Sequence, residues 1–266
     1  MPKRQKQKLL NGEVKISKKV LKIMIAALLI CSMTFGGIKE HIFGGSTPIK
    51  PDLRTEEDKN IDSAALEILH RSHGDFTVLD KFLASKGYIR VKRNNDVSIK
   101  STGNDIDLSL ERYVYSNYLP LKQKVFIYFD WKHPDPYPGS PDRIGIAWDS
   151  NLFYAVGCAY SAYSSLGAPE NDKMWLSDTV PSTYTWELNE TGSEWYYSAY
   201  VDNGAAVVTL QAWDRNNPNL GTMYGKYCHT YNTTSVSVTI GYPWVMSVTA
   251  ATGSDYWERA PYPLYP

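Results

Sequence analysis

The sequence predicts a mainly β protein, an antiparallel β-sandwich or jelly roll with a small N-terminal helical (α+β) lead-in. Apolar and polar residues alternate through much of residues 105–266, with the two-residue period of half-buried strands. Turn-forming Gly, Pro, Asn and Asp separate these runs. Apolar stripes at helical spacing occur before residue 88, and none of helix length follows residue 105.

The chain is expected to divide into four segments. These are a signal peptide or N-terminal anchor (1–37), a linker (38–60), a small α+β lead-in (61–104) and a β-sandwich domain (105–266).

The first segment has the pattern of a secretory signal. Residues 1–22 hold eight Lys or Arg and one acidic residue, and the 13 residues from Ile23 to Phe35 carry no charge. A membrane-spanning helix needs roughly 20 apolar residues, so cleavage near Gly36 or Gly37 is expected, with an uncleaved anchor as the alternative. We therefore predict a secreted or cell-surface protein that meets a membrane only through this segment, if it is uncleaved.

The remaining residues hold 20 basic and 27 acidic side chains, a net charge of −7. This balance argues against a nucleic-acid partner. Cleavage would remove Cys31 and leave Cys158 and Cys228, which in an exported chain predict one disulfide. A metal or nucleophile site built from Cys228 and His229 is the alternative.

Two short helices are expected in the lead-in. Ile61, Ala65 and Ile68 belong to the apolar stripe of the first, and His70 and His73 near its end suggest either solvated histidines or metal ligands. The second has Asp75 or Thr77 as its cap, a stripe from Val78 to Leu83, and Gly87 where a left-handed C-terminal cap belongs. The unit could act as a docking module or propeptide, or as a cap packed on the main sheet.

The central stretch, Lys124 to Ser150, reads as two strands joined by a proline-rich loop. One face is expected to be core, formed by Val125, Ile127, Phe129 and Trp131 with Ile144, Ile146 and Trp148 as partners. The other face, with Phe126, Tyr128 and Asp130, is expected to be an exposed surface.

Two further turns are predicted downstream. Asn203-Gly204 lies between two alternating runs, which is a strong hairpin signal, so we expect a tight turn there. Residues 233–252 alternate Ser or Thr with apolar residues, which predicts an ordinary sandwich hairpin or, alternatively, a membrane-inserting one.

No known catalytic motif marks this chain as an enzyme. There is no G-x-S-x-G, P-loop, dinucleotide fingerprint, H-E-x-x-H or EF-hand loop. A carbohydrate-active hydrolase needs only paired carboxylates, and the weak candidates are Asp130, Asp149 and Asp214, each beside a tryptophan that could raise its pKa.

Non-catalytic binding of carbohydrate or cell-envelope polymer fits the composition better. All eight tryptophans follow residue 110, and rings exposed on a rigid sheet can stack on sugars while neighbouring acids bind hydroxyl groups. The candidate ligand-binding residues are Tyr128, Asp130, Tyr137, Asp142, Asp149, Trp195, Tyr197 and Trp213. No cofactor is expected, although Asp130, Asp135 and Asp142 are weak candidates for calcium ligands.

Three stretches also carry a resemblance. Phe129 to Trp131, Asp142 to Asp149 and the helix of Leu79 to Tyr88, behind a signal segment, resemble uncharacterised secreted proteins of Gram-positive, spore-forming bacteria. The resemblance covers about half the chain. It implies a location outside the cytoplasm and no particular activity.

Overall fold

In the computed structural model, contacts divide the chain into residues 1–44 and 45–266, and all described residues belong to the second unit. The structure describes residues 51–92, 101–102, 106–116, 122–132, 141–164, 169, 173–180, 182–189, 201–231, 236–239, 247–250, 255–261 and 263–266. None of its described helices is long and apolar enough to cross a membrane.

Two helices precede a series of antiparallel strands. The elements are α2 (Glu56–Arg71), α3 (Phe76–Ser85), β1 (Tyr88–Arg90), β2 (Ser101–Thr102), β3 (Ile106–Tyr115), β4 (Lys122–Trp131), β5 (Asp142–Trp148), β6 (Phe153–Ser164), β7 (Met174–Val180), β8 (Thr183–Leu188), β9 (Val201–Ala212), β10 (Met223–Tyr231), β11 (Val236–Thr239), β12 (Ser247–Ala250) and β13 (Asp255–Arg259).

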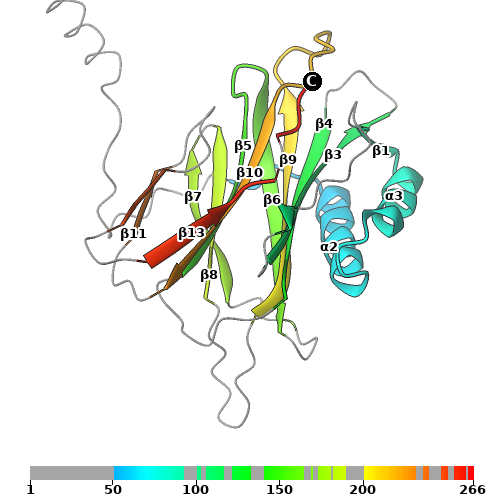
Figure 1. The fold of residues 1–266 in the computed structure, drawn as a ribbon. Coiled ribbons are helices and arrows are strands. Elements are labelled where there is room, and N and C mark those ends of the chain that lie inside the picture. The colour runs from blue at the N-terminus through cyan, green and yellow to red at the C-terminus, as the bar shows by residue number, and fades with distance from the viewer. Residues whose placement is uncertain are drawn as a thin grey trace, which may run out of the picture. The chain divides into compact units, whose positions relative to one another are not determined.

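The strands form an antiparallel β-sandwich, as predicted. The first sheet has the order β1-β3-β4-β9-β6, with β2 also paired to β3, and the second has the order β13-β10-β5-β8-β7. Strands β11 and β12 pair separately, within the stretch expected to form a hairpin, and residues 240–246 between them lie outside the described residues. Helices α2 and α3 pack on the outer face of the first sheet (Figure 1).

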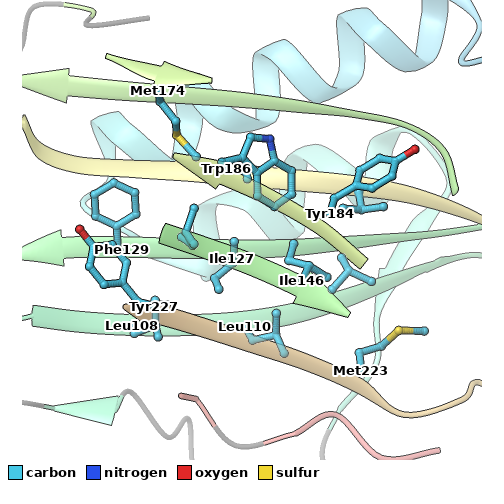
Figure 2. Packing of buried hydrophobic residues seen from close by; sticks show 14 of the residues in the cluster. Leu108, Leu110, Ile127, Phe129, Ile146, Met174, Tyr184, Trp186, Met223 and Tyr227 are labelled. Carbon is cyan, nitrogen blue, oxygen red and sulfur yellow. The ribbon is translucent and has the colours of Figure 1, made fainter. Parts of the chain in front are cut away.

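The predicted core face is confirmed. Val125, Ile127 and Phe129 of β4 are 0% exposed and pack against Ile146 and Trp148 of β5 in one cluster between the sheets. Figure 2 shows side chains of this cluster reaching toward one another from several strands. Burial of such side chains stabilises the fold by about 1.5–3 kcal/mol each.

The prediction that the opposite face of β4 is an exposed surface is wrong. Phe126 and Tyr128 are 0% and 3% exposed, because α2 and α3 cover them. The turn between the helices lies directly on the Tyr128 ring: a Cβ at Gly74 would be 2.4 Å from a ring carbon. Gly74 also has φ +72°, so both the close packing and the backbone conformation favour glycine at this position.

Helix α2 begins at Glu56, five residues before the apolar stripe that marked it in the sequence. Thr55 caps it, since its side chain accepts a hydrogen bond from the backbone N–H of Asp58, and the Asp58 carboxylate accepts one in return from the backbone N–H of Thr55. The preceding residue Leu53 donates a backbone hydrogen bond to Val156 of β6. Part of the expected linker therefore belongs to the packed structure.

Charged side chains also join α2 to the first sheet. Lys124 Nζ lies 2.5 Å from Asp62 Oδ1, and both side chains are 0% exposed. Arg54 donates a 2.8 Å hydrogen bond to the other oxygen of Asp62. We call the group of charged residues that meets here the Asp62 cluster: Asp52, Arg54, Asp58, Asp62, Lys122 and Lys124.

The predicted turn at Asn203-Gly204 is also wrong, because both residues lie inside β9. Asn203 pairs with Asp130 and Gly204 with Phe129 across the β4–β9 ladder. A Cβ at Gly204 would be 2.6 Å from the Phe129 ring and 2.8 Å from the Ser161 carbonyl oxygen. Glycine is required here for close packing within a strand.

The predicted disulfide is wrong as well, since Cys158 and Cys228 are free thiols. Cys158 packs against the core between the sheets. Cys228 pairs with Arg143, and both alternate with core-facing neighbours on their strands, so Cys228 points to the outer face of the second sheet. The second sheet therefore separates the two sulfur atoms.

We expect both thiols to be unreactive in the folded protein. Burial raises the pKa of Cys158 and of Cys228 to about 12, so little thiolate forms at pH 8. Iodoacetamide followed by peptide mass spectrometry should label neither cysteine in native protein and both in unfolded protein without reductant. A Cys158–Cys228 linked peptide, or a lower melting temperature with reductant, would contradict the assignment.

We also expect part of the acid sensitivity to come from Asp58. Burial acts to raise the pKa of this carboxyl group, but hydrogen bonds from Lys122 and Thr55, together with the positive charges of Lys124 and Lys122, outweigh burial and lower the pKa from 3.8 to about 2. A lowered pKa stabilises the fold above the unfolded value, and this contribution is lost as the pH falls from about 4 towards about 2.

Urea denaturation of wild type and Asp58→Asn across this pH range would test the prediction. The variant should be less stable at neutral pH and should lose less of its remaining stability on acidification. Equal losses in the two proteins would show that Asp58 does not contribute.

Candidate functional site

An exposed aromatic platform lies at the end of β9, where Trp213 follows the last strand residue. Trp213 is 62% exposed, although its backbone N–H donates to the Leu152 carbonyl and its Nε1–H donates to the Ser150 carbonyl, at 3.0 and 2.9 Å. The Tyr154 ring lies alongside, with 4.4 Å between centroids and 37° between planes. We call Trp213 and Tyr154 the Trp213 platform.

Polar side chains stand beside the platform in two turns. Asp149 closes the turn after β5 by accepting a 2.9 Å hydrogen bond from the backbone N–H of Asn151. Asp214 does the same for Asn216 in the turn after Trp213. The hydrogen bonds from Trp213 to residues 150 and 152 hold these turns together, so the structure brings together three predicted site residues.

The loop after Trp213 is fastened to the sandwich by a buried arginine. Arg112 of β3 is 1% exposed, and one of its terminal nitrogens donates to the carbonyls of Leu220 and Gly221, at 2.9 and 2.8 Å. The other terminal nitrogen donates to the Tyr265 carbonyl at 2.6 Å. One core-facing side chain thus ties the platform's loop and the C-terminal segment to the first sheet.

The three candidate catalytic carboxylates do not share one site. Asp130 pairs with Asn203, ten residues before Trp213 on β9, which is about 33 Å at ~3.3 Å per strand residue. A glycosidase pair needs its carboxyl groups about 5–10 Å apart. Asp130 therefore cannot act with Asp149 or Asp214, and only the latter two lie at the same end of the sandwich.

Two predicted ligand-binding residues are buried. Tyr128 lies beneath the helices, where burial raises the pKa of its phenol well above the usual range. Asp142 is 1% exposed and lies in the core between the sheets, where it accepts hydrogen bonds from the Tyr227 hydroxyl and the backbone N–H of Thr230, at 2.5 and 2.9 Å. Neither side chain is available to a ligand at the surface.

Asp142 instead anchors a buried polar network. His229 Nδ1 lies 3.0 Å from both carboxylate oxygens, and the Trp131 indole donates to the Tyr227 hydroxyl at 3.2 Å. The Cys228–His229 alternative is not supported, because Cys228 points out of the core while His229 points into it. The sequence contained one usable signal: Asp142 alternates in phase with core residues Ile144 and Ile146.

The predicted metal ligands are not brought together either. Asp130 lies on the outer face of the first sheet and Asp142 lies between the sheets, so the backbone of the first sheet separates them. His70 is occupied by a 2.9 Å contact with Asn203 Oδ1 and by stacking on Tyr163. Within the described ranges, no group of three or more His, Cys, Asp or Glu could hold a metal ion.

Four predicted residues lie outside the described residues: Asp135, Tyr137, Trp195 and Tyr197. Tyr154 was not among the predicted site residues. Its run of tyrosines and small residues predicts a strand, but the partner that makes it part of a platform lies 59 residues further along the chain.

No family model matches the sequence, and the search of curated proteins gives no significant match. Solved structures resemble the chain only loosely. Clostridium perfringens delta-toxin is 10% identical, with 67% of this chain and 94% of that chain covered and a TM-score of 0.34. The collagen-binding domain of a Staphylococcus aureus adhesin is 6% identical, covering 52% and 87%, with a TM-score of 0.29.

A third example is the sixth cohesin of scaffoldin B from Acetivibrio cellulolyticus, solved in complex with a dockerin. It is 7% identical, with 41% of this chain and 74% of that chain covered and a TM-score of 0.27.

We expect the buried Asp142 network to contribute strongly to stability. Asp142→Ala leaves His229, the Tyr227 hydroxyl and the Thr230 N–H without their carboxylate, which should lower the free energy of unfolding by about 3–5 kcal/mol. The matched control is Asp149→Ala. Asp149 directly follows the last residue of β5 and is half-exposed, so this change should lower the free energy of unfolding by about 1 kcal/mol or less. Urea denaturation of both variants measures this, and equal losses would contradict it.

Proposed function

We propose that this protein is an extracytoplasmic, non-catalytic binding module that holds carbohydrate or cell-envelope polymer on the Trp213 platform. The observation that carries the proposal is Trp213 itself: the residue is 62% exposed, and yet its indole is held by the Nε1–H hydrogen bond to Ser150 and its backbone by a hydrogen bond to Leu152. Tryptophan combines a broad apolar face with a polar N–H edge, which is why it is enriched at interfaces. A rigid exposed indole suits an interaction with a partner.

The fixed position of the ring favours binding. A side chain that is already ordered loses little conformational entropy when a ligand arrives, whereas ordering a free one costs about 0.5–1.5 kcal/mol. Here the Nε1 hydrogen bond to Ser150 and the Tyr154 ring hold the indole before any ligand is present. The apolar face of a pyranose ring could stack on such a surface.

The neighbouring groups supply the polar half of the interaction. Asp149, Asp214 and Asn216 carry oxygen and nitrogen atoms that bond sugar hydroxyl groups, and Asp214 and Asn216 are exposed. The open position of the ring suits a polymer passing over it better than a small molecule enclosed in a pocket. The signal-like N-terminal segment supports placing this surface outside the cytoplasm, where such polymers are found.

Paired-carboxylate hydrolysis is the weaker candidate, since Asp130 lies far from the other two acids. The binding proposal needs no catalytic pair. Incubation of the polymer with the protein should therefore release no new reducing ends.

The test is binding of wild type and variants to insoluble cell-wall polysaccharide and to a glycan array. Trp213→Ala should weaken binding at least about tenfold, equivalent to about 1.4 kcal/mol, because the stacking surface is lost. Trp213→Phe keeps a ring and should retain part of the affinity. Ile89→Ala is the matched control, since Ile89 is a 56% exposed apolar residue of β1, at the opposite edge of the first sheet.

Unchanged binding by Trp213→Ala, with wild type bound, would move the site elsewhere on the protein. Failure of wild type to bind any glycan or wall fraction would overturn the proposal. Release of reducing ends that Asp149→Asn or Asp214→Asn abolishes would favour the hydrolase instead.

A further inference from the structure

The Asp62 cluster contains an amine and a carboxylate in contact and sealed from solvent. Lys124 Nζ lies 2.5 Å from Asp62 Oδ1, and both side chains are 0% exposed. Lys124 is on β4, the middle strand of the first sheet, and Asp62 is in the second turn of α2. Two opposite charges in a fully buried site carry a large desolvation cost, which a neutral product would remove.

We propose that Lys124 and Asp62 condense to form an intramolecular isopeptide bond that joins α2 covalently to β4. The Nζ–Cγ bond forms and the Cγ–Oδ1 bond breaks. Two of the three ammonium hydrogens leave with Oδ1 as one water molecule, and the third stays on the amide nitrogen. Because the charges of ammonium and carboxylate cancel, the step is balanced and needs no further reactant.

The neighbouring groups can move the protons that this step requires. The amine must first lose a proton, and Asp58 Oδ1, 3.6 Å from Nζ, is positioned to accept it and later return it to the departing oxygen. Burial lowers the pKa of Lys124, although Asp62 acts in the opposite direction, so the neutral amine is easier to reach than in water.

Two donors hold the carboxylate oxygen that would remain as the amide carbonyl. Arg54 donates to Asp62 Oδ2 at 2.8 Å and the Thr209 hydroxyl donates to the same atom at 3.2 Å. Negative charge would develop on this oxygen as the amine adds to Cγ. Fixed donors aimed at such an oxygen are a strong form of stabilisation in acyl transfer.

The charge balance of the cluster is also consistent with the bond. Three acids face three bases, and condensation removes one of each. The remaining groups stay paired, because Arg54 retains Asp52 at 2.7 Å and Lys122 retains Asp58 at 2.5 Å. The contact between the amine and the carboxylate also lowers the entropic part of the activation barrier, since groups held in position react as if at effective concentrations of about 10⁵–10⁸ M.

Peptide mass spectrometry of the purified full-length protein tests this directly. Trypsin should release residues 60–71 joined to residues 123–132 at Asp62 and Lys124, lighter than the sum of the two peptides by one water molecule. Lys226 and Glu258 provide an internal control: they lie 2.6 Å apart but are partly exposed, and should yield no linked peptide.

Three variants distinguish chemistry from structure. Lys124→Arg keeps the positive charge but should give no linked peptide, while Lys122→Arg should still give it. Asp58→Asn should slow the appearance of the bond at least about tenfold in freshly refolded protein, as expected for loss of a general base. Recovery of residues 60–71 and 125–132 only as separate peptides, with trypsin cleaving after an unmodified Lys124 in folded wild-type protein, would overturn the proposal.

Discussion

The docking of α2 onto β4 is the constraint on which the arrangement of this protein depends. Apolar side chains of both helices cover Phe126 and Tyr128, and the contact between Lys124 and Asp62 fixes the helix along and across the strand. A buried ion pair gains little net stability over apolar packing, but it permits few alternative positions, because any shift would leave a charge unpaired. The outer face of the first sheet is consequently an interior surface.

With that face covered by the helices, the first sheet can present exposed functional groups only at its ends and edges. The Trp213 platform is at such an end, beyond the last residue of β9. Arg112 fastens its loop from within the core, and the turn after β5 holds the indole. A rigid β scaffold therefore presents a ring in a fixed position, the arrangement that favours recognition of a partner.

Polar groups buried on both sides of the first sheet hold the neighbouring helix and strands in fixed positions relative to it. On the helical side, the Asp62 cluster joins α2, β4 and β9. Between the sheets, the Asp142 carboxylate joins β5 to β10, and Trp131 links that network to β4. Fully satisfied networks of this kind can favour one packing arrangement over near neighbours, since a shifted sheet would leave donors unpaired.

The sequence by itself determined the β-sandwich, the core-facing rows of β4 and β5, the presence of two helices, a cap for the second helix at Asp75 or Thr77 with Gly87 after its end, and Trp213 with the adjacent Asp214 as a candidate binding group. These features depend on the local alternation of apolar and polar residues and on the types of residue that lie next to one another in the sequence.

Only the tertiary structure decided what the second face of each strand meets. Alternation shows that Tyr128 points away from the core of the sandwich, but not that a helix covers it. Asn203-Gly204 has the composition of a turn, yet the approach of Phe129 requires glycine inside a strand. Cys158 and Cys228 have the count of a disulfide, and the strand order places a sheet between them. In each case contacts between distant segments, which local sequence does not encode, outweighed the local preference.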